Sequence, residues 1–173
     1  MDEALQLLLE MNERTWKRFK ADLQDMTPEE IDWRPLPQAN TINAILRHLR
    51  VEAEWYLESL KHGEQSPYQD TASVEQLADS IPLDFEQNLR ELEELYLEFI
   101  AALRRTTLTA LQNQTVLDQV FPGGAPHSGD LLSYRQALHL AIHWGQIRSI
   151  RNLYRRTRGE LGRFFPDNPT FPA

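Results

Sequence analysis

The sequence predicts an all-α protein, a four-helix bundle with long crossover connections. Glycine is scarce, with 7 among 173 residues, and stretches rich in Leu, Glu, Ala, Arg and Gln place apolar residues three and four positions apart, which is the helical period. Three of the connections between these stretches are longer than the tight turns of a simple up-and-down bundle. At this length we expect one domain, covering residues 1–173.

The first helix is expected over residues 2–24, where an apolar stripe that includes Leu9 recurs at helical spacing. A short helical turn should follow, because Thr27 can act as its N-cap and Pro28 suits its first position. The proline-rich residues 33–37 then break the helix and form a connector.

The second helix is expected to begin at Asn40 or Thr41, since either side chain can cap it. It should end near Lys61, where Gly63 can close it. Residues 63–81 form a long polar connection.

That connection contains Ser73-Val-Glu-Gln, a capping-box pattern, and so predicts a short helix over residues 74–79. Pro82 suits the first turn of a third long helix, which we expect to run to Arg104 with a regular apolar face.

Residues 115–121 are partly alternating and rich in β-branched side chains, so they predict a short extended segment that ends at Pro122. Ser128 or Asp130 can then cap the fourth long helix, expected over residues 131–156.

Two histidines of the fourth helix, His139 and His143, lie four residues apart, so both imidazoles face the same side and can share one ion. His48 lies in the second helix on the apolar stripe with Ile45 and Leu49 and should point toward the bundle interior. Bundles build metal sites from side chains on facing helices. One divalent cation would satisfy the ring nitrogens of three buried, neutral imidazoles at once.

The alternative interpretation of these histidines is structural. A histidine on an apolar face is more often a hydrogen-bonded core residue, and a pair spaced by four occurs by chance on many helices. His62 and His127 fall in expected surface connections, where a solvated role is the simpler interpretation.

Further candidates lie close to the three histidines in sequence. Glu52 follows His48 by one turn, so its carboxylate can orient an imidazole, act as a base, or simply pair with an arginine. Gln146 can bind a substrate or satisfy a structural contact. Arg148 can bind an anionic co-substrate, although arginines at a helix end are usually solvated. Gly145 predicts a close approach of two helices, since glycine inside a helix costs about 1 kcal/mol relative to alanine.

Composition excludes several classes of protein. With 18 basic and 26 acidic residues the net charge is −8, which disfavours nucleic-acid binding. The lack of cysteine excludes disulfides, a thiolate nucleophile and Cys-ligated metal. No apolar run of 18 residues and no basic leader is present, so we expect a cytoplasmic protein without a membrane span. No phosphate-binding glycine loop or Rossmann fingerprint is present.

Two segments resemble the DinB-like superfamily, which includes the YfiT-type proteins: NTINAILRHL at residues 40–49 and HLAIHWGQIR at residues 139–148. TPEEIDWRP at residues 27–35 is also similar to the stretch before the second helix of that family. The resemblance covers nearly the whole chain. It implies a four-helix bundle with long crossovers, often a homodimer.

The resemblance also implies a divalent ion held by His48, His139 and His143. Imidazole ligands suit Zn, Ni, Fe and Cu, and we expect Zn or Ni, with Fe or Mn as alternatives. Some relatives are transferases or isomerases that use low-molecular-weight thiols such as bacillithiol or mycothiol, and others are described as metal-dependent hydrolases.

Our leading hypothesis is a metal-dependent S-transferase that joins a thiol co-substrate to a small electrophile, because this chain has no thiol of its own. The alternatives are a metal-dependent hydrolase of a small ester or amide and a non-enzymatic dimer that binds metal or a ligand. The transferase requires an added thiol, the hydrolase does not, and the binding protein shows neither activity.

Overall fold

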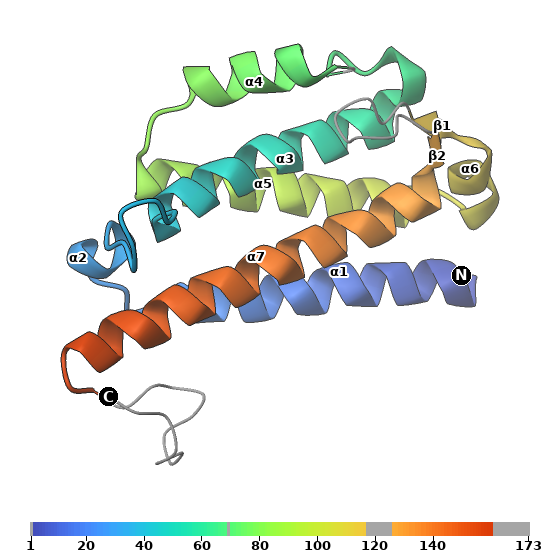
Figure 1. Ribbon diagram of the computed structural model, residues 1–173. Coiled ribbons are helices and arrows are strands. Elements are labelled where there is room, and N and C mark those ends of the chain that lie inside the picture. Colours follow the sequence, from blue (N-terminus) through green and yellow to red (C-terminus); the bar gives the residue numbers. More distant parts are fainter. Residues whose placement is uncertain (1, 69, 117–125, 161–173) are drawn as a thin grey trace.

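The computed structural model describes residues 2–68, 70–116 and 126–160. Its body consists of four long helices (Figure 1): α1 (Glu3–Asp22), α3 (Ile42–His62), α5 (Phe85–Arg105) and α7 (Gly129–Thr157). Helix α1 packs against α5 and α7, and α3 packs against the same two helices. Helices α1 and α3 therefore lie at opposite corners, and the predicted all-α bundle is confirmed.

Helices α3 and α5 run in the same direction, because ion pairs join Arg50 to Glu91 and, further along both helices, Lys61 to Glu98. Helices α1 and α7 run together in the opposite direction (Figure 1). Two consecutive parallel helices need a return connection, and the segment that contains α4 (Thr71–Ser80) supplies it by running back along α3. This is a crossover of the kind that the sequence predicts.

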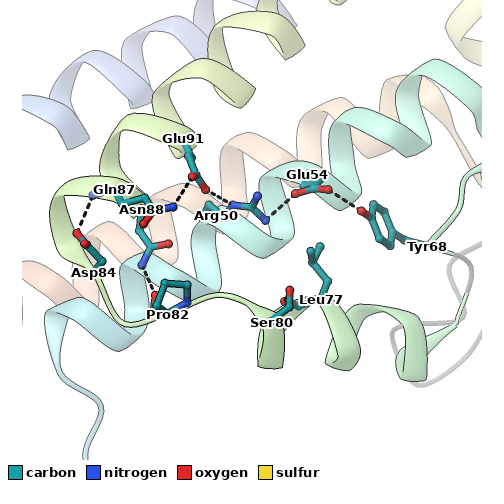
Figure 2. Close-up of polar contacts among 10 residues, drawn as sticks. All are labelled: Arg50, Glu54, Tyr68, Leu77, Ser80, Pro82, Asp84, Gln87, Asn88 and Glu91. Atoms are coloured by element: carbon teal, nitrogen blue, oxygen red, sulfur yellow. Dashed lines mark hydrogen bonds and ion pairs between the residues drawn. The ribbon is translucent and has the colours of Figure 1, made fainter.

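Polar contacts hold one end of this crossover against the bundle (Figure 2). The hydroxyl of Tyr68, just before α4, donates to Glu54 Oε1 at 2.5 Å. Arg50 pairs with both Glu54 and Glu91, at 2.6 and 3.0 Å. Burial, together with the negative charge of Glu54, raises the pKa of Tyr68 to about 12. The phenol therefore stays protonated and keeps donating throughout the physiological range.

The other end of the crossover shows why α5 starts later than predicted. Asp84 is its N-cap and accepts from the backbone N–H of Gln87 at 2.9 Å. The side-chain amide of Asn88 donates to the carbonyl oxygen of Pro82 at 2.9 Å (Figure 2). The prediction that Pro82 lies in the first turn is wrong, because the Asp84 cap places that turn at Phe85.

Capping also decides the limits of α4. The helix begins at Thr71 rather than at residue 74, because Asp70 is its N-cap and accepts from the backbone N–H of Ser73 at 2.7 Å. Ser73 is thus inside the helix that it was predicted to cap. At the end of α3, Gly63 has a φ of +56° and closes the helix as expected.

The region between α5 and α7 contains a helix that the sequence analysis did not predict, α6 (Leu108–Asn113). Two short strands follow, β1 (Thr115–Val116) and β2 (His127–Ser128), and pair antiparallel. The predicted extended segment over residues 115–121 is confirmed for its first two residues, and the rest lies outside the described part. Ser128, one of the two predicted caps, precedes α7.

The remaining short elements are α2 (Pro28–Ile31), capped by Thr27 as predicted, and the 3-10 turn η1 (Gly63–Gln65). In the middle of α1, the side-chain amide of Asn12 donates to the carbonyl oxygen of Ser133 at 3.2 Å and accepts from the Tyr96 hydroxyl at 3.0 Å. These contacts join α1, α5 and α7 inside the core.

Within the described residues, none of the helices has the length and hydropathy that a membrane crossing requires.

A buried ion pair joins α2 to the last turns of α7. Arg151, 5% exposed, donates from Nε to Oε1 of Glu30, 3% exposed, at 2.6 Å. Its guanidinium also donates to the backbone oxygen of Asp22 at the end of α1. The indole N–H of Trp144 donates to the Asp22 carboxylate at 2.7 Å. The ends of α1, α2 and α7 are therefore held together by a buried ion pair and by hydrogen bonds to Asp22.

Replacing Arg151 with methionine should lower the free energy of unfolding by about 3 kcal/mol or more, because Glu30 would keep a buried charge without its cation. Urea unfolding followed by circular dichroism measures the change. Arg105→Met is the matched control, since Arg105 is exposed at the end of α5 and its loss should cost no more than about 0.5 kcal/mol. Equal effects of the two substitutions would contradict a stabilising role for the buried pair.

Candidate metal centre

Three histidines from two helices, His48 of α3 and His139 and His143 of α7, converge where these antiparallel helices pack together. The Nε2 atom of His139 lies 3.2 Å from Nε2 of His48 and 3.0 Å from Nε2 of His143. The potential ligand atoms all lie within 4.8 Å of one another. The fold thus brings together the three residues that helical spacing singled out.

The spacing of the nitrogen atoms fits a shared cation. Two imidazole nitrogens bound to one tetrahedral ion at about 2.0 to 2.1 Å lie about 3.3 Å apart. Hydrogen bonding alone fits less well, because each nitrogen of a neutral imidazole offers either one N–H or one lone pair. His139 Nε2 therefore cannot form a full hydrogen bond with both neighbours, whereas a cation would use all three lone pairs.

Gln146 orients one of these rings. Its Oε1 atom lies 2.7 Å from Nδ1 of His143, so Nδ1 carries the proton and donates to the amide oxygen. In a neutral imidazole this leaves a lone pair on Nε2, the atom that faces the cluster. Gln146 is predicted to contact a substrate or a structural partner, and in the structure it contacts His143, a candidate metal ligand. Its role toward a substrate stays a prediction.

The electrostatic environment keeps the cluster uncharged. None of the three rings is fully buried, yet the loss of surrounding water lowers the pKa of His48 to about 4 and that of His139 to about 3, with smaller contributions from the neighbouring histidines and, for His139, from Arg135. Removal from water also lowers the pKa of His143, although its bond to Gln146 opposes the shift. At neutral pH all three are in the form that binds a metal.

The cluster of donor atoms consists of the three imidazoles, and Glu52 is not part of it. Glu52 is buried, 5% exposed, one turn of α3 beyond His48. Its predicted role as a base or an orienting group stays a prediction.

Arg148 points toward the end of α1. Its Nε lies 3.5 Å from the Asp22 carboxylate, and its guanidinium lies 4.9 Å from the centroid of the Trp144 ring. Its predicted role in binding an anionic substrate stays a prediction. Arg151, one turn further along α7, is buried in its pair with Glu30.

The two remaining histidines lie apart from the cluster. His62 is exposed, as predicted, but belongs to the last turn of α3 rather than to a connection, and its Nε2 lies 3.4 Å from Glu58. His127 lies in β2, where it pairs in register with Val116.

A groove of about 650 Å³ lies beside the histidines and was not predicted from the sequence. Its walls come from the connector before α3, from Ile45 of α3 and from one face of α7 that includes Gly145, Gln146 and Ser149. A Cβ atom built on Gly145 would meet nothing within 4 Å. The predicted close helix approach at Gly145 is therefore wrong, since the residue faces open space in the groove.

Comparison with known proteins places this arrangement in a wider context. The family model described as the DinB superfamily matches residues 11–147, a region that contains all three clustered histidines. A crystal structure of a conserved protein from Enterococcus faecalis is similar, with a TM-score of 0.61 and 19% sequence identity over 86% of this chain and 95% of that chain. At that identity the likeness concerns the fold alone. Among proteins with curated descriptions, none matches this chain significantly.

The metal-free protein should lose stability as the pH falls from about 6.5 toward 4. Histidines of the unfolded chain take up protons near pH 6.5, whereas folded His48 and His139 do so only at about 4 and 3. The unfolded state therefore binds more protons across this range, and the stabilisation that is complete above pH 6.5 is lost as the pH falls.

Urea unfolding of chelator-treated protein at pH 7.5 and 5.0 measures this dependence. The double variant His48→Gln/His139→Gln should show a smaller loss between the two pH values, because these two groups no longer contribute. An unchanged pH dependence in the double variant would contradict the assignment.

Proposed function

The chain belongs to the DinB superfamily, and from that premise we propose that it binds one divalent metal ion through His48, His139 and His143 and catalyses the transfer of a small thiol to a small electrophile. The observation that carries the proposal is the convergence of three Nε2 atoms, since that of His139 lies 3.2 Å from that of His48 and 3.0 Å from that of His143. Zn or Ni is the expected ion, with Fe or Mn as alternatives.

The ligand set favours catalysis over a purely structural site. Three protein ligands leave at least one position for water or substrate, whereas structural zinc sites are closed by four. A divalent ion in such a site supplies Lewis acidity that lowers the pKa of a thiol or water. Because the three imidazoles are neutral, they do not offset the charge of the ion, which favours an anionic group in the open position.

The thiol has to come from a co-substrate, since the chain has no cysteine. In the proposed transfer the thiol sulfur forms a bond to an electrophilic carbon, and the leaving group departs with its electron pair. The thiol proton passes to a base. We assign that role to Glu52, whose carboxylate is buried one turn of α3 beyond His48.

Protein purified without added metal should contain about one divalent ion per chain, and His48→Ala and His143→Ala should each lose it. Elemental analysis by mass spectrometry measures the content. His62→Ala is the matched control, because His62 is an exposed histidine of the same helix as His48 and should retain the metal. Gln146→Leu should weaken metal affinity by about 10- to 100-fold, since His143 would lose the group that orients it.

Retention of stoichiometric metal by both alanine variants would refute the assignment of those ligands. If Gln146→Leu bound metal as tightly as the parent protein, the orienting role of Gln146 would be wrong while the ligand assignment could stand.

A small neutral electrophile such as 1-chloro-2,4-dinitrobenzene should be consumed above the buffer rate only when both metal and an added thiol are present. Bacillithiol, mycothiol and glutathione would be compared, with product formation followed by absorbance. His143→Ala should reduce the rate to background, and His62→Ala should not. Metal-dependent cleavage of p-nitrophenyl acetate without thiol, in place of the transfer, would instead identify a hydrolase.

A further inference from the structure

The groove beside the histidines has the size and position of a substrate site. Building on the proposed function, we infer that it holds the uncharged, apolar body of the electrophilic substrate while the reactive carbon lies near His143. Its volume of about 650 Å³ falls within the range of about 300 to 1,000 Å³ that small-molecule pockets occupy.

Gln146 connects the lining of the groove to the histidine cluster. Gln146 lines the groove and, through Oε1, contacts Nδ1 of His143 at 2.7 Å. Ile142, the residue before His143, is another part of the wall, and Ile45 contributes from α3 one turn before His48. A small molecule that fills the groove therefore lies within one helical turn of the candidate metal-binding histidines on both helices.

The chemistry of the walls defines the ligand class. Aliphatic side chains, among them Ile45, Ile142 and Leu153, make up much of the lining, and among the described residues no charged side chain contributes to it. Arg148 is turned away toward Asp22. Moving a carboxylate or phosphate from water into such a site without a charged partner is unfavourable. A neutral aromatic or aliphatic group fits, with Asn40 and Gln146 able to hydrogen-bond a polar substituent.

Gly145 keeps the groove open. It lies in the middle of α7, where glycine is a poor helix former, and a Cβ built on it would contact nothing within 4 Å. No packing contact within the described residues therefore requires glycine here. A longer side chain would extend into the groove without disturbing the bundle, so the position offers a direct test.

A second copy of the chain is the competing occupant. Exposed apolar residues continue along α7 beyond the groove, among them Leu131, Tyr134 and Leu138. The groove is open, with walls from the connector, α3 and α7, and its lining residues Ile142 and Leu153 are themselves about half exposed. Its volume and its contact with His143 through Gln146 favour a small molecule, whereas a helix-to-helix contact would also use the exposed residues of α7 outside the groove.

The test compares Gly145→Leu with Gly145→Ala, because both remove the glycine and only leucine fills the groove. The neutral dye Nile red is titrated into the purified protein and its fluorescence is followed. The dissociation constant should rise at least tenfold for Gly145→Leu and stay within twofold for Gly145→Ala. Ser149→Leu, on the same wall, should act like Gly145→Leu. Circular dichroism and elemental analysis would establish that folding and metal content are unchanged.

Charge preference is measured by displacing Nile red with 2-naphthol and with 2-naphthalenesulfonate, which have the same ring system. The neutral compound should compete at least tenfold better, and equal competition would overturn the proposed ligand class. Analytical ultracentrifugation of each variant tests whether a second copy of the chain occupies the groove. If Gly145→Leu changed the oligomeric state and left dye binding unaltered, the groove would be a subunit contact and the inference would be wrong.

The metal measurement separates this inference from the proposed function. If the protein binds Nile red in a Gly145-dependent manner but contains no metal, the groove stands as a binding site and the proposed metal-dependent transferase is wrong. If the protein contains the metal but binds the dye equally well in all variants, the metal centre stands and the groove is not a substrate site.

Discussion

The register of α7 against its neighbours is the constraint on which the candidate centre depends. At the start of the helix, a Cβ on Gly129 would lie 2.5 Å from Oε1 of Gln114 and 3.1 Å from the backbone oxygen of Leu111, so a larger residue would displace the Gln114 side chain. Gln114 in turn donates to the backbone oxygen of Leu60, near the end of α3, at 2.6 Å. Near the other end, Arg151 is held by Glu30. The histidines lie between these two points, so a shift of α7 by one turn would move His139 and His143 by about 5 Å relative to His48.

Helical periodicity was sufficient to predict the four long helices and the shared face of His139 and His143, because both depend on spacing within one segment. Periodicity cannot identify the third histidine on another helix, because it shows which face of a helix is apolar but not which helix packs against that face. His48 could be assigned from its apolar neighbours together with the family resemblance. The start of α5 could not, because Pro82 and Asp84 are both good initiating residues and only the fold shows Asp84 accepting from Gln87.

The arginines of α7 show a second limit of sequence reasoning. A cluster of cations near a helix C-terminus is usually a solvated surface that complements the helix dipole. Here Arg151 reaches Glu30, 121 positions earlier in the chain, and Arg148 approaches Asp22. Neither acidic residue stands out locally from the many other carboxylates of an acidic chain. The groove was missed for a similar reason, since glycine predicts a helix contact and an open wall equally well.

Because the site is uncharged, two neighbouring surfaces, the histidine cluster and the groove, would recognise different parts of a substrate. The histidines are held in their uncharged form by their surroundings, and no charged side chain from the part of the chain that the structure describes lines the groove. With an ion bound, the concentrated charge of the site would be that of the ion itself. The reactive group would then be selected by its affinity for a cation and the rest of the substrate by shape and hydrophobicity. Gln146 touches both surfaces, so a ligand that hydrogen-bonds its amide would compete with His143 and thereby alter the geometry of the centre.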